Sequence, residues 1–454
     1  MTKIYCARWV LPITSGPISD GAVAVEGTRV AGVGARAEVS ERFPSAEVSE
    51  LGEAALLPGF VNCHTHLELT AMRGLLEPEE GDFFSWLRKV TVSRNERMTA
   101  DDLYVSAAWG AVEAARAGIT CVGDASDAGA TTMRALRDAG LRAVVYQEAF
   151  GPDAVEAAQQ YDKARAKVDA LRGGETALVT LGLSPHSPYT VAPPLLERLA
   201  RYAADERLPL MMHAAESEAE QALLVEGGGI FAAAYAFRGF AFDSPRTTTV
   251  RHLANTGVLD ARPLLAHCVR VDEGDIELMR KFGAGVAHCP KSNAKLGHGR
   301  APLAAMLNAG VDVGLGSDSV ASNNVCDVLE ESRFALLASR AAFETVGGGR
   351  MLDASDALRL STRGGASAMN MQGVTGALEE GLEADLVAVS LEGAHQAPSY
   401  EPAAALVFSS SGRDVLLTVV AGREVFRDGR VTTLDEADLR ARLLDAARRL
   451  ALPS

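Results

Sequence analysis

The chain has 454 residues, 48% of them hydrophobic and 23% charged, and this composition indicates a globular protein and excludes disordered and fibrous classes. Its formal net charge of −15 argues against nucleic acid and anionic membranes as partners, because both are bound through clustered Lys and Arg. No apolar stretch reaches the roughly 18 residues of a membrane span and the N-terminus lacks a signal-peptide core, so we expect a soluble cytoplasmic protein.

Both ends of the chain show short strand patterns with glycine-containing turns. GAVAVEGTRVAGVG lies near the start, and ADLVAVS and DVLLTVVAGREVF lie near the end. Because the two ends share this style, we expect residues 1–57 and 371–454 to meet in one small β-sandwich domain. A helix with a Thr-Leu-Asp-Glu capping box at Thr433 is predicted to close the chain.

Between these ends, residues 58–370 alternate apolar strand patterns with helical periodicity. The strand patterns are ALLPGFVN, ITCVGDAS, LRAVVYQEAF, ALVTLGLSPHS, PLMMHAAES, PLLAHCVRV, AGVAHCPKS and VDVGLGSD. Eight strands in this length favour a (β/α)₈ barrel over an open doubly wound sheet. We therefore predict an α/β fold, a TIM-like barrel with an accessory β-sandwich.

A pair of histidines, His64 and His66 in LPGFVNCHTH, ends the first barrel strand. Residues i and i+2 of a strand face the same side, so both imidazoles point into the mouth of the barrel. Taken alone, the motif fits a metal site and also fits two hydrogen-bonded core histidines.

Three further polar residues also end predicted strands, namely His213, His267 and Asp318. Catalytic groups collect at this rim of a barrel, so we predict that His64, His66, His213 and Asp318 hold one divalent metal ion, Zn²⁺ or else Fe²⁺. Such an ion lowers the pKa of bound water from about 15.7 to about 7. A second ion is not expected, because the fourth strand has no lysine that could bridge two ions. The six scattered cysteines form no Cys-x-x-Cys pair, so they indicate neither a zinc ribbon nor a disulfide framework.

Glu216, three residues after His213, is the predicted proton shuttle from water to substrate. An N-cap or surface carboxylate is the alternative interpretation. His267 could be a fifth ligand, but we expect it to orient the water, and Asp318 could also accept a proton. The catalytic set is thus Glu216, His267 and Asp318. His252, His298 and His395 lie in helix or loop patterns and receive no role.

These motifs resemble the amidohydrolase superfamily, and within it the mononuclear aminohydrolases of nucleosides and related heterocycles. LPGFVNCHTH, SPHSPYT, HAAES, AHCV, HCPKSNAKLGHG and GSDSVASNN carry the resemblance. It implies the barrel, the four metal ligands, the shuttle at Glu216 and the role of His267 that are given above. The narrower motifs HTHLELT, GDFFSWLRKV and YQEAFG are similar to aminodeoxyfutalosine deaminases. Deaminases of S-adenosylhomocysteine and methylthioadenosine are similar too, but they clamp the ribose diol with a glutamate where this chain has Asn95, with Glu96 next to it.

Residues near the predicted strand ends are candidates for substrate contact: Trp86, His186, Arg73, Glu148 and Asn95. Phe83, Phe84 and Trp86 could form an aromatic wall, although packing of a helix against the barrel would give the same pattern. An ion pair would likewise explain Arg73 and Glu148. For His288, in AHCPKSN, substrate contact and a structural role both stay open.

The sequence thus predicts a metal-dependent deaminase that removes the exocyclic amine of an adenosine-like nucleoside, with aminodeoxyfutalosine as the first substrate to test. The alternatives are deamination of S-adenosylhomocysteine, methylthioadenosine, adenosine or guanine, and chloride displacement from a triazine. A non-catalytic barrel homologue is a further alternative from another class. The expected partners are a small-molecule substrate and further copies of the chain, in a homodimer or a larger oligomer.

Overall fold

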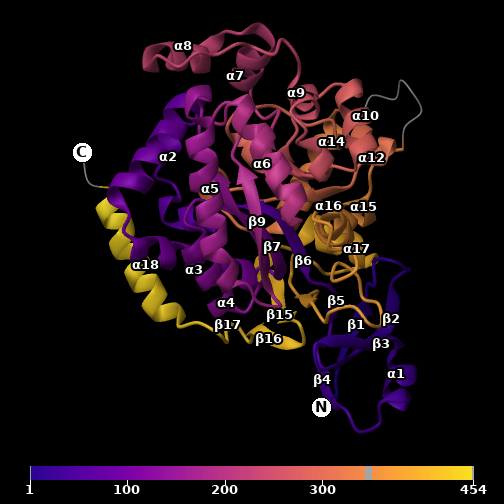
Figure 1. Cartoon of the computed structure of the whole chain (residues 1–454). Helices are drawn as coiled ribbons and strands as arrows, with labels where there is room; N and C mark the ends of the chain where they lie inside the picture. Colours follow the sequence, from indigo (N-terminus) through magenta and orange to yellow (C-terminus); the bar gives the residue numbers. More distant parts are fainter. Residues whose placement is uncertain (1, 343–349, 452–454) are drawn as a thin grey trace.

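Eight parallel strands form the centre of the protein in the computed structural model, which describes residues 2–342 and 350–451 (Figure 1). The strands are β6 (Phe60–Thr65), β7 (Ile119–Ser126), β8 (Arg142–Ala149), β9 (Val179–Pro185), β10 (Met211–Ala214), β11 (Leu264–His267), β12 (Gly285–His288) and β13 (Val313–Leu315). Seven of the eight predicted runs contain one of them, and the first run, residues 55–62, overlaps only the start of β6. The protein is therefore a mixed α/β structure with parallel strands.

The central strands are divided into two four-stranded parallel sheets, β6-β7-β8-β9 and β10-β11-β12-β13. The two sheets meet along both edges. At one edge Leu183 of β9 forms a parallel bridge with Leu210, just before β10. At the other, the backbone N–H of Asp318 donates to the carbonyl oxygen of His64 at 2.9 Å.

Helices follow the strands along the chain and cover the sheets. They are α2 (Phe83–Arg97), α3 (Ala100–Arg116), α4 (Gly129–Ala139), α5 (Ala157–Leu171), α6 (Pro193–Glu206), α7 (Glu218–Gln221), α8 (Gly229–Arg238), α9 (Thr249–Asn255), α10 (Glu273–Phe282), α11 (Pro290–Lys295), α12 (Leu303–Ala309), α13 (Val320–Asn323), α14 (Val328–Ala341), α15 (Ala354–Arg359) and α16 (Gly365–Ala368). In α6 the buried Leu195, Leu196 and Leu199 lie on one face, as the period of 3.6 predicts.

Alternation along the strands divides the core into two layers. In β8, Ala143 and Val145 belong to the cluster between strands and helices, whereas Val144 and Tyr146 belong to a cluster enclosed by the strands. The enclosed cluster also contains Met369, from the chain segment after α16. The interior of the strand assembly is thus filled with side chains, which leaves the carboxyl ends of the strands for the site.

Both ends of the chain contribute to one nine-stranded sheet with the order β17-β16-β15-β14-β5-β1-β2-β3, in which β4 pairs with β1. Its strands are β1 (Thr2–Val10), β2 (Ile18–Glu26), β3 (Arg29–Ala35), β4 (Glu47–Glu50), β5 (Ala54–Pro58), β14 (Leu386–Ser390), β15 (Val415–Val420), β16 (Arg423–Arg427) and β17 (Arg430–Val431). The halves join where β14 runs antiparallel to β5. In Figure 1 this sheet lies at the opposite end of the molecule from α7 and α8. A sandwich and boundaries at residues 57 and 371 stay predictions, and residue 1 and residues 452–454 of the outer segments lie outside the described residues.

The short helix α1 (Arg36–Arg42) packs against β2 and β3 of this sheet, α17 (Pro402–Ala404) contacts α15, and α18 (Glu436–Leu450) packs against α3 (Figure 1). The predicted capping box at Thr433 is wrong, because α18 begins at Glu436. Asp435 is its N-cap and accepts from the N–H groups of Ala437 and Asp438. Thr433 instead donates its hydroxyl to the carbonyl oxygen of Ala139 at 2.8 Å. Within residues 2–342 and 350–451, no helix combines the length and hydropathy that a membrane span requires.

Candidate active site

The predicted metal ligands come together at the carboxyl ends of the central strands. His64 lies in β6, His66 directly follows β6, His213 lies in β10 and Asp318 comes three residues after β13. His66 Nε2 is 3.2 Å from His213 Nε2, and Asp318 Oδ1 is 3.4 Å from His64 Nε2 and 3.7 Å from His66 Nε2. Atoms around one tetrahedral zinc ion lie roughly 3.3 Å apart when each bond is about 2.0 Å long. The four side chains therefore have the spacing of a common coordination centre.

Unsatisfied buried nitrogen atoms support the same interpretation. His64 is fully buried, yet neither of its ring nitrogens has a hydrogen-bond partner among the described residues. A buried polar atom without a partner costs free energy, so such atoms call for an explanation. The possible ligand atoms of His64, His66 and His213 lie within 4.8 Å of one another, as do those of His64, His267 and Asp318. The donor set of imidazoles and one carboxylate suits zinc.

Hydrogen bonds behind these residues fix their orientation. His213 Nδ1 lies 2.9 Å from the carbonyl oxygen of His186, which makes Nδ1 the donor and leaves the Nε2 lone pair directed at the cluster. Asp318 Oδ2 accepts from the hydroxyls of Ser292 at 2.5 Å and Ser322 at 2.9 Å. Its Oδ1 accepts from the backbone N–H of Ser319 at 2.7 Å.

The charge states also suit a cation. Burial lowers the pKa of His66 to about 3, and burial together with the His186 imidazole lowers the pKa of His213 well below its usual value. Both rings are therefore neutral at pH 7, with lone pairs to donate. Burial alone would raise the pKa of Asp318, but the neighbouring His64 imidazole outweighs it and holds that pKa well below its ordinary value. Asp318 is accordingly a carboxylate.

The backbone is unusual at several site positions. His267 has a φ of 74° and Asp318 a φ of 56°, in the left-handed region that residues other than glycine seldom adopt. Ala215, between His213 and Glu216, has a φ of 51°. Such conformations cluster at functional sites, where the surrounding fold imposes them.

Glu216 lies next to this cluster and is 4% exposed. The alternative that it is an N-cap or a surface carboxylate is wrong, because Ser217 is the N-cap of α7 and accepts from the N–H of Glu220. Burial raises the pKa of Glu216, but His267 and His298 lower it further than burial raises it, so the net pKa lies below the usual value. Glu216 is thus an ionised, buried carboxylate that can accept a proton.

Two more histidines line this part of the site. His267 Nε2 lies 3.7 Å from Glu216 Oε1, and its Nδ1 lies 2.9 Å from Asn293 Oδ1. His298 Nε2 lies 3.4 Å from the same Glu216 oxygen. The structure thus places His298 beside Glu216, although no role was expected for it. The sequence signal that could have revealed it is its place between Gly297 and Gly299, directly after HCPKSNAKL.

A cavity of about 650 Å³ opens above these groups, a volume typical of small-molecule sites. Its floor includes His66, His213, Glu216, His267 and Asp318. Of the predicted substrate contacts, Trp86, His186, Glu148 and Asn95 line the cavity. Its wall also contains residues that sequence reasoning missed, Glu68, Arg94, Asp127, Tyr189 and Phe231.

Arg73 is not brought into the cavity. Its guanidinium pairs with the carboxylate of Glu113, and the Arg73 side chain is 38% exposed. Because this partner comes from α3, forty residues further along the chain, the pairing could not be inferred from the sequence around Arg73. The structure thus gives no support to the predicted substrate contact of Arg73.

The polar wall is formed by a network of charges. Arg94 Nε donates to Glu68 Oε1 at 2.5 Å, and its Nη1 donates to Asn95 Oδ1 at 2.8 Å and to Asp127 Oδ2 at 3.1 Å. Glu148 is buried, its Oε1 lacks a hydrogen-bond partner, and burial followed by the charge of Glu68 raises its pKa well above the ordinary value. A protonated Glu148 can donate to a substrate oxygen or nitrogen.

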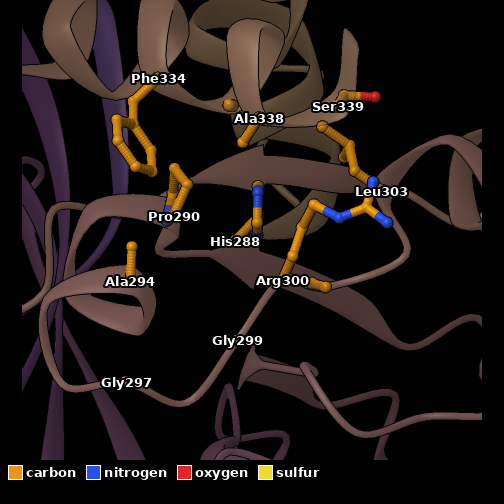
Figure 2. Close-up of a pocket in the computed structure, with 12 residues that line it drawn as sticks. His288, Pro290, Ala294, Gly297, Gly299, Arg300, Leu303, Phe334, Ala338 and Ser339 are labelled. Atoms are coloured by element: carbon orange, nitrogen blue, oxygen red, sulfur yellow. The ribbon is translucent and has the colours of Figure 1, made fainter. Parts of the chain in front are cut away.

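A second, smaller cavity of about 320 Å³ lies beside β12, α11 and α14, and Figure 2 shows His288 and Arg300 beneath Phe334 and Ala338. Ala287 belongs to the cluster enclosed by the strands, so the next residue of β12, His288, points outward toward the helices. His288 lines this second cavity and does not line the first. The structure therefore favours a non-catalytic role for His288.

These features define an α/β protein with histidine and aspartate side chains that could hold a metal ion, and similarity to known proteins gives its family. The sequence profile described as the amidohydrolase family matches residues 55–425, and the chain belongs to this family. It is a hydrolase that acts on carbon–nitrogen bonds.

Individual relatives are similar over nearly the whole chain. A 5-methylthioadenosine/S-adenosylhomocysteine deaminase of Pelotomaculum thermopropionicum is 34% identical over 436 residues, which cover 96% of this chain and 95% of the relative. One from Nitratidesulfovibrio vulgaris is 34% identical over 425 residues, covering 93% and 90%. Among solved structures, a zinc-bound adenosine deaminase from Xanthomonas campestris has a TM-score of 0.85 at 27% identity, covering 99% and 98% of the chains. An atrazine chlorohydrolase from Arthrobacter aurescens, with a TM-score of 0.84 at 24% identity, shares the fold.

Proposed function

We propose that the protein is a zinc-dependent deaminase that hydrolyses the exocyclic amine of an adenosine-like nucleoside and releases ammonia. The observation that carries this proposal is the convergence of three imidazoles and one carboxylate next to the buried Glu216, at the floor of a cavity of about 650 Å³. The relatives named as 5-methylthioadenosine/S-adenosylhomocysteine deaminases and the structural neighbour named as an adenosine deaminase support the same chemistry.

In this proposal His64, His66, His213 and Asp318 hold one divalent ion. Zinc is favoured because the adenosine deaminase from Xanthomonas campestris is described with bound zinc and because the donors are imidazole and carboxylate. When bound, the ion supplies Lewis acidity that makes water a competent nucleophile near neutral pH. The unpartnered Nε2 of His64, which faces Asp318, is the local feature that the ion would satisfy.

The residues of the chain supply the proton transfers. Glu216, ionised and buried, takes a proton from the water as its oxygen bonds to the ring carbon that carries the amine, and passes that proton to the adjacent ring nitrogen. The second proton goes to the amine, the carbon–nitrogen bond breaks and ammonia leaves. His267, fixed at Nδ1 by Asn293, faces Glu216 and orients the water.

The scaffold supports one catalytic unit. We infer that the two parallel sheets form a single (β/α)₈ barrel over residues 58–370, because they contact each other at both edges and because the chain overlays solved structures over 99% of its length. Residues 1–57 and 371–454 then form the accessory β domain. The substrate binds at the barrel mouth, where the cavity lies.

The cavity wall bears on which group the ribose of the nucleoside substrate carries. The wall contains the aromatic rings of Phe83, Trp86 and Phe231 together with the cations Arg88 and Arg238, so it can accept an apolar tail and an anionic end. We propose nucleosides with a substituted 5′ position as the substrate class, and aminodeoxyfutalosine is kept in the panel beside methylthioadenosine and S-adenosylhomocysteine.

The test is ammonia release by purified zinc-loaded protein from five nucleosides or bases: methylthioadenosine, S-adenosylhomocysteine, adenosine, aminodeoxyfutalosine and guanine. A triazine is assayed in parallel for chloride. The proposal predicts ammonia from at least one adenosine nucleoside, with loss of the adenine-type absorbance, and strongly reduced turnover by the Glu216→Gln variant. Chloride release without ammonia, or zinc-loaded protein inactive on every adenosine nucleoside, would overturn it.

A further inference from the structure

We propose that His298 is a positioning residue of this active site, which together with His267 holds the Glu216 carboxylate between two imidazoles that are both attached to Asn293. The inference rests on the proposed function, because it concerns the residue that moves the protons. It adds a residue from a loop after α11 to a set that otherwise comes from the strand ends.

Two imidazoles lie close to the Glu216 carboxylate. His298 Nε2 lies 3.4 Å and His267 Nε2 lies 3.7 Å from the carboxylate, and the oxygen nearest to both imidazoles is Oε1. Oε1 thus has an imidazole on each of two sides, and in this proposal Oε2 is the oxygen that serves the water and the substrate.

One residue, Asn293, connects the two imidazoles. The side chain of Asn293 lies 2.9 Å from His267 Nδ1, and its backbone oxygen accepts from the N–H of His298 at 2.8 Å. Asn293 is 1% exposed, so it is a fixed point in the core. A displacement of Asn293 would move both partners of Glu216 together.

The loop that carries His298 has an unusual backbone conformation. Gly297 has a φ of 70° and Gly299 a φ of 106°, and only glycine adopts the second value without strain. Figure 2 shows these two glycines in the chain segment that passes below the second cavity. His298 itself is 6% exposed and faces Glu216 and not that cavity. The two glycines thus allow the sharp turn that directs a buried imidazole inward.

The His298 ring packs against an aromatic side chain of the cavity wall. It meets Phe83, the first residue of α2, edge to face, with centroids 4.5 Å apart and an interplanar angle of 85°. Phe83 lines the substrate cavity. This contact restricts rotation of the imidazole, so that Nε2 stays directed at Glu216. His298 Nε2 is buried and has no hydrogen-bond partner among the described residues, so the Glu216 carboxylate 3.4 Å away is the charged group available to it.

The test compares His298→Ala with His298→Gln, whose amide can donate from a similar position. We expect His298→Ala to lower kcat about 10- to 100-fold, as loss of a hydrogen bond to a charged group would, with KM and zinc content little changed. His298→Gln should recover most of that loss. In the Glu216→Gln background, His298→Ala should cause no further loss of kcat, because His298 acts through Glu216. The matched control is His288→Ala, which removes a buried imidazole that faces the other cavity and should leave kcat unchanged.

A substrate-free measurement separates failure of this inference from failure of the proposed function. Urea unfolding of the zinc-loaded wild type, His298→Ala, Glu216→Gln and the double variant gives a cycle that needs no turnover. Non-additive effects on the free energy of unfolding support the contact, even if no substrate is found. Additive effects in this cycle, or an unchanged kcat in His298→Ala of an active enzyme, would overturn the inference.

Discussion

At the scale of single residues, Glu216 decides the pH dependence of the reaction. It acts as a base only when ionised, and its pKa lies below the usual value because His267 and His298 outweigh burial. The rate of a reaction that needs this base is therefore constant above that pKa and falls as the pH drops through it. We expect the acidic limb of kcat/KM to lie below the pH at which an ordinary glutamate titrates, measured as a pH–rate profile with the zinc content checked at each pH.

The matching variant is Glu216→Gln, which keeps the shape of the side chain and removes the base. We expect kcat to fall about 10²- to 10⁴-fold, the usual contribution of a general base. The zinc content should stay at that of the wild type, because Glu216 is not among the proposed ligands. A variant that loses zinc along with activity would make Glu216 a ligand and contradict its assignment as the shuttle.

Metal retention is the third prediction at this scale. His64→Ala and His66→Ala each remove one proposed ligand, so the zinc-to-chain ratio after dialysis should fall from near one to near zero. Atomic emission measures the ratio, and ammonia release should fall with it. His252→Ala is the control, because His252 is a buried histidine of α9 that belongs to none of the possible ligand groups. Equal zinc in His64→Ala and in this control would refute the ligand assignment.

The ligand set could be predicted from the sequence because strand periodicity and strand ends fix where His64, His66 and His213 point. His298 could not, because the direction of a loop side chain depends on backbone angles at Gly297 and Gly299 that no periodicity encodes. Arg73 failed for a related reason, since its partner Glu113 lies on another helix.

At the scale of elements, the start of α2 holds the aromatic side of the cavity in place. Asp82 caps the helix by accepting from the N–H groups of Phe84 and Ser85. Trp86 lines the cavity and also belongs to a core cluster with Leu69 and Met72, so both interpretations of this residue hold. The sequence predicted the strands better than this helix, because α2 has few buried residues and no clear apolar face.

Trp86→Ala should therefore affect stability more than chemistry. The ring is 6% exposed, and removing a buried tryptophan costs about 3–5 kcal/mol of the free energy of unfolding. Urea unfolding of zinc-loaded protein measures this loss. Trp86→Phe, which keeps much of the apolar area, should lose far less. If Trp86→Ala kept wild-type stability and only raised KM, the residue would belong to the cavity wall and not to the core.

At the scale of the whole molecule, the sheet made from both chain ends is fastened to the central strands by charge. Arg142, at the start of β8, donates from Nε to Asp385 Oδ2 at 2.8 Å and from Nη2 to Asp385 Oδ1 at 3.1 Å. Asp385 immediately precedes β14 and also accepts from the backbone N–H of Ala421 at 2.8 Å. The sequence indicated that the two ends meet, but a pair separated by 243 residues cannot be inferred without a fold.

The Arg142–Asp385 pair gives a test of how much the nine-stranded sheet and the central parallel strands stabilise each other. Both side chains are almost fully buried, so Asp385→Asn leaves the guanidinium with only the 3.3 Å contact between its Nη2 and Glu383 Oε2. This loss should lower the free energy of unfolding by up to about 3–5 kcal/mol. The double variant Arg142→Met/Asp385→Leu removes both charges and should be more stable than Asp385→Asn. Arg448→Ala, which breaks the exposed pair with Asp445, is the control and should have no measurable effect.

Because Arg142 lies at the opposite end of its strand from the site, kcat of the folded variants should stay at the wild-type value, measured by ammonia release below the unfolding transition. An Asp385→Asn protein with wild-type stability would show that the charges do not join the two parts of the molecule.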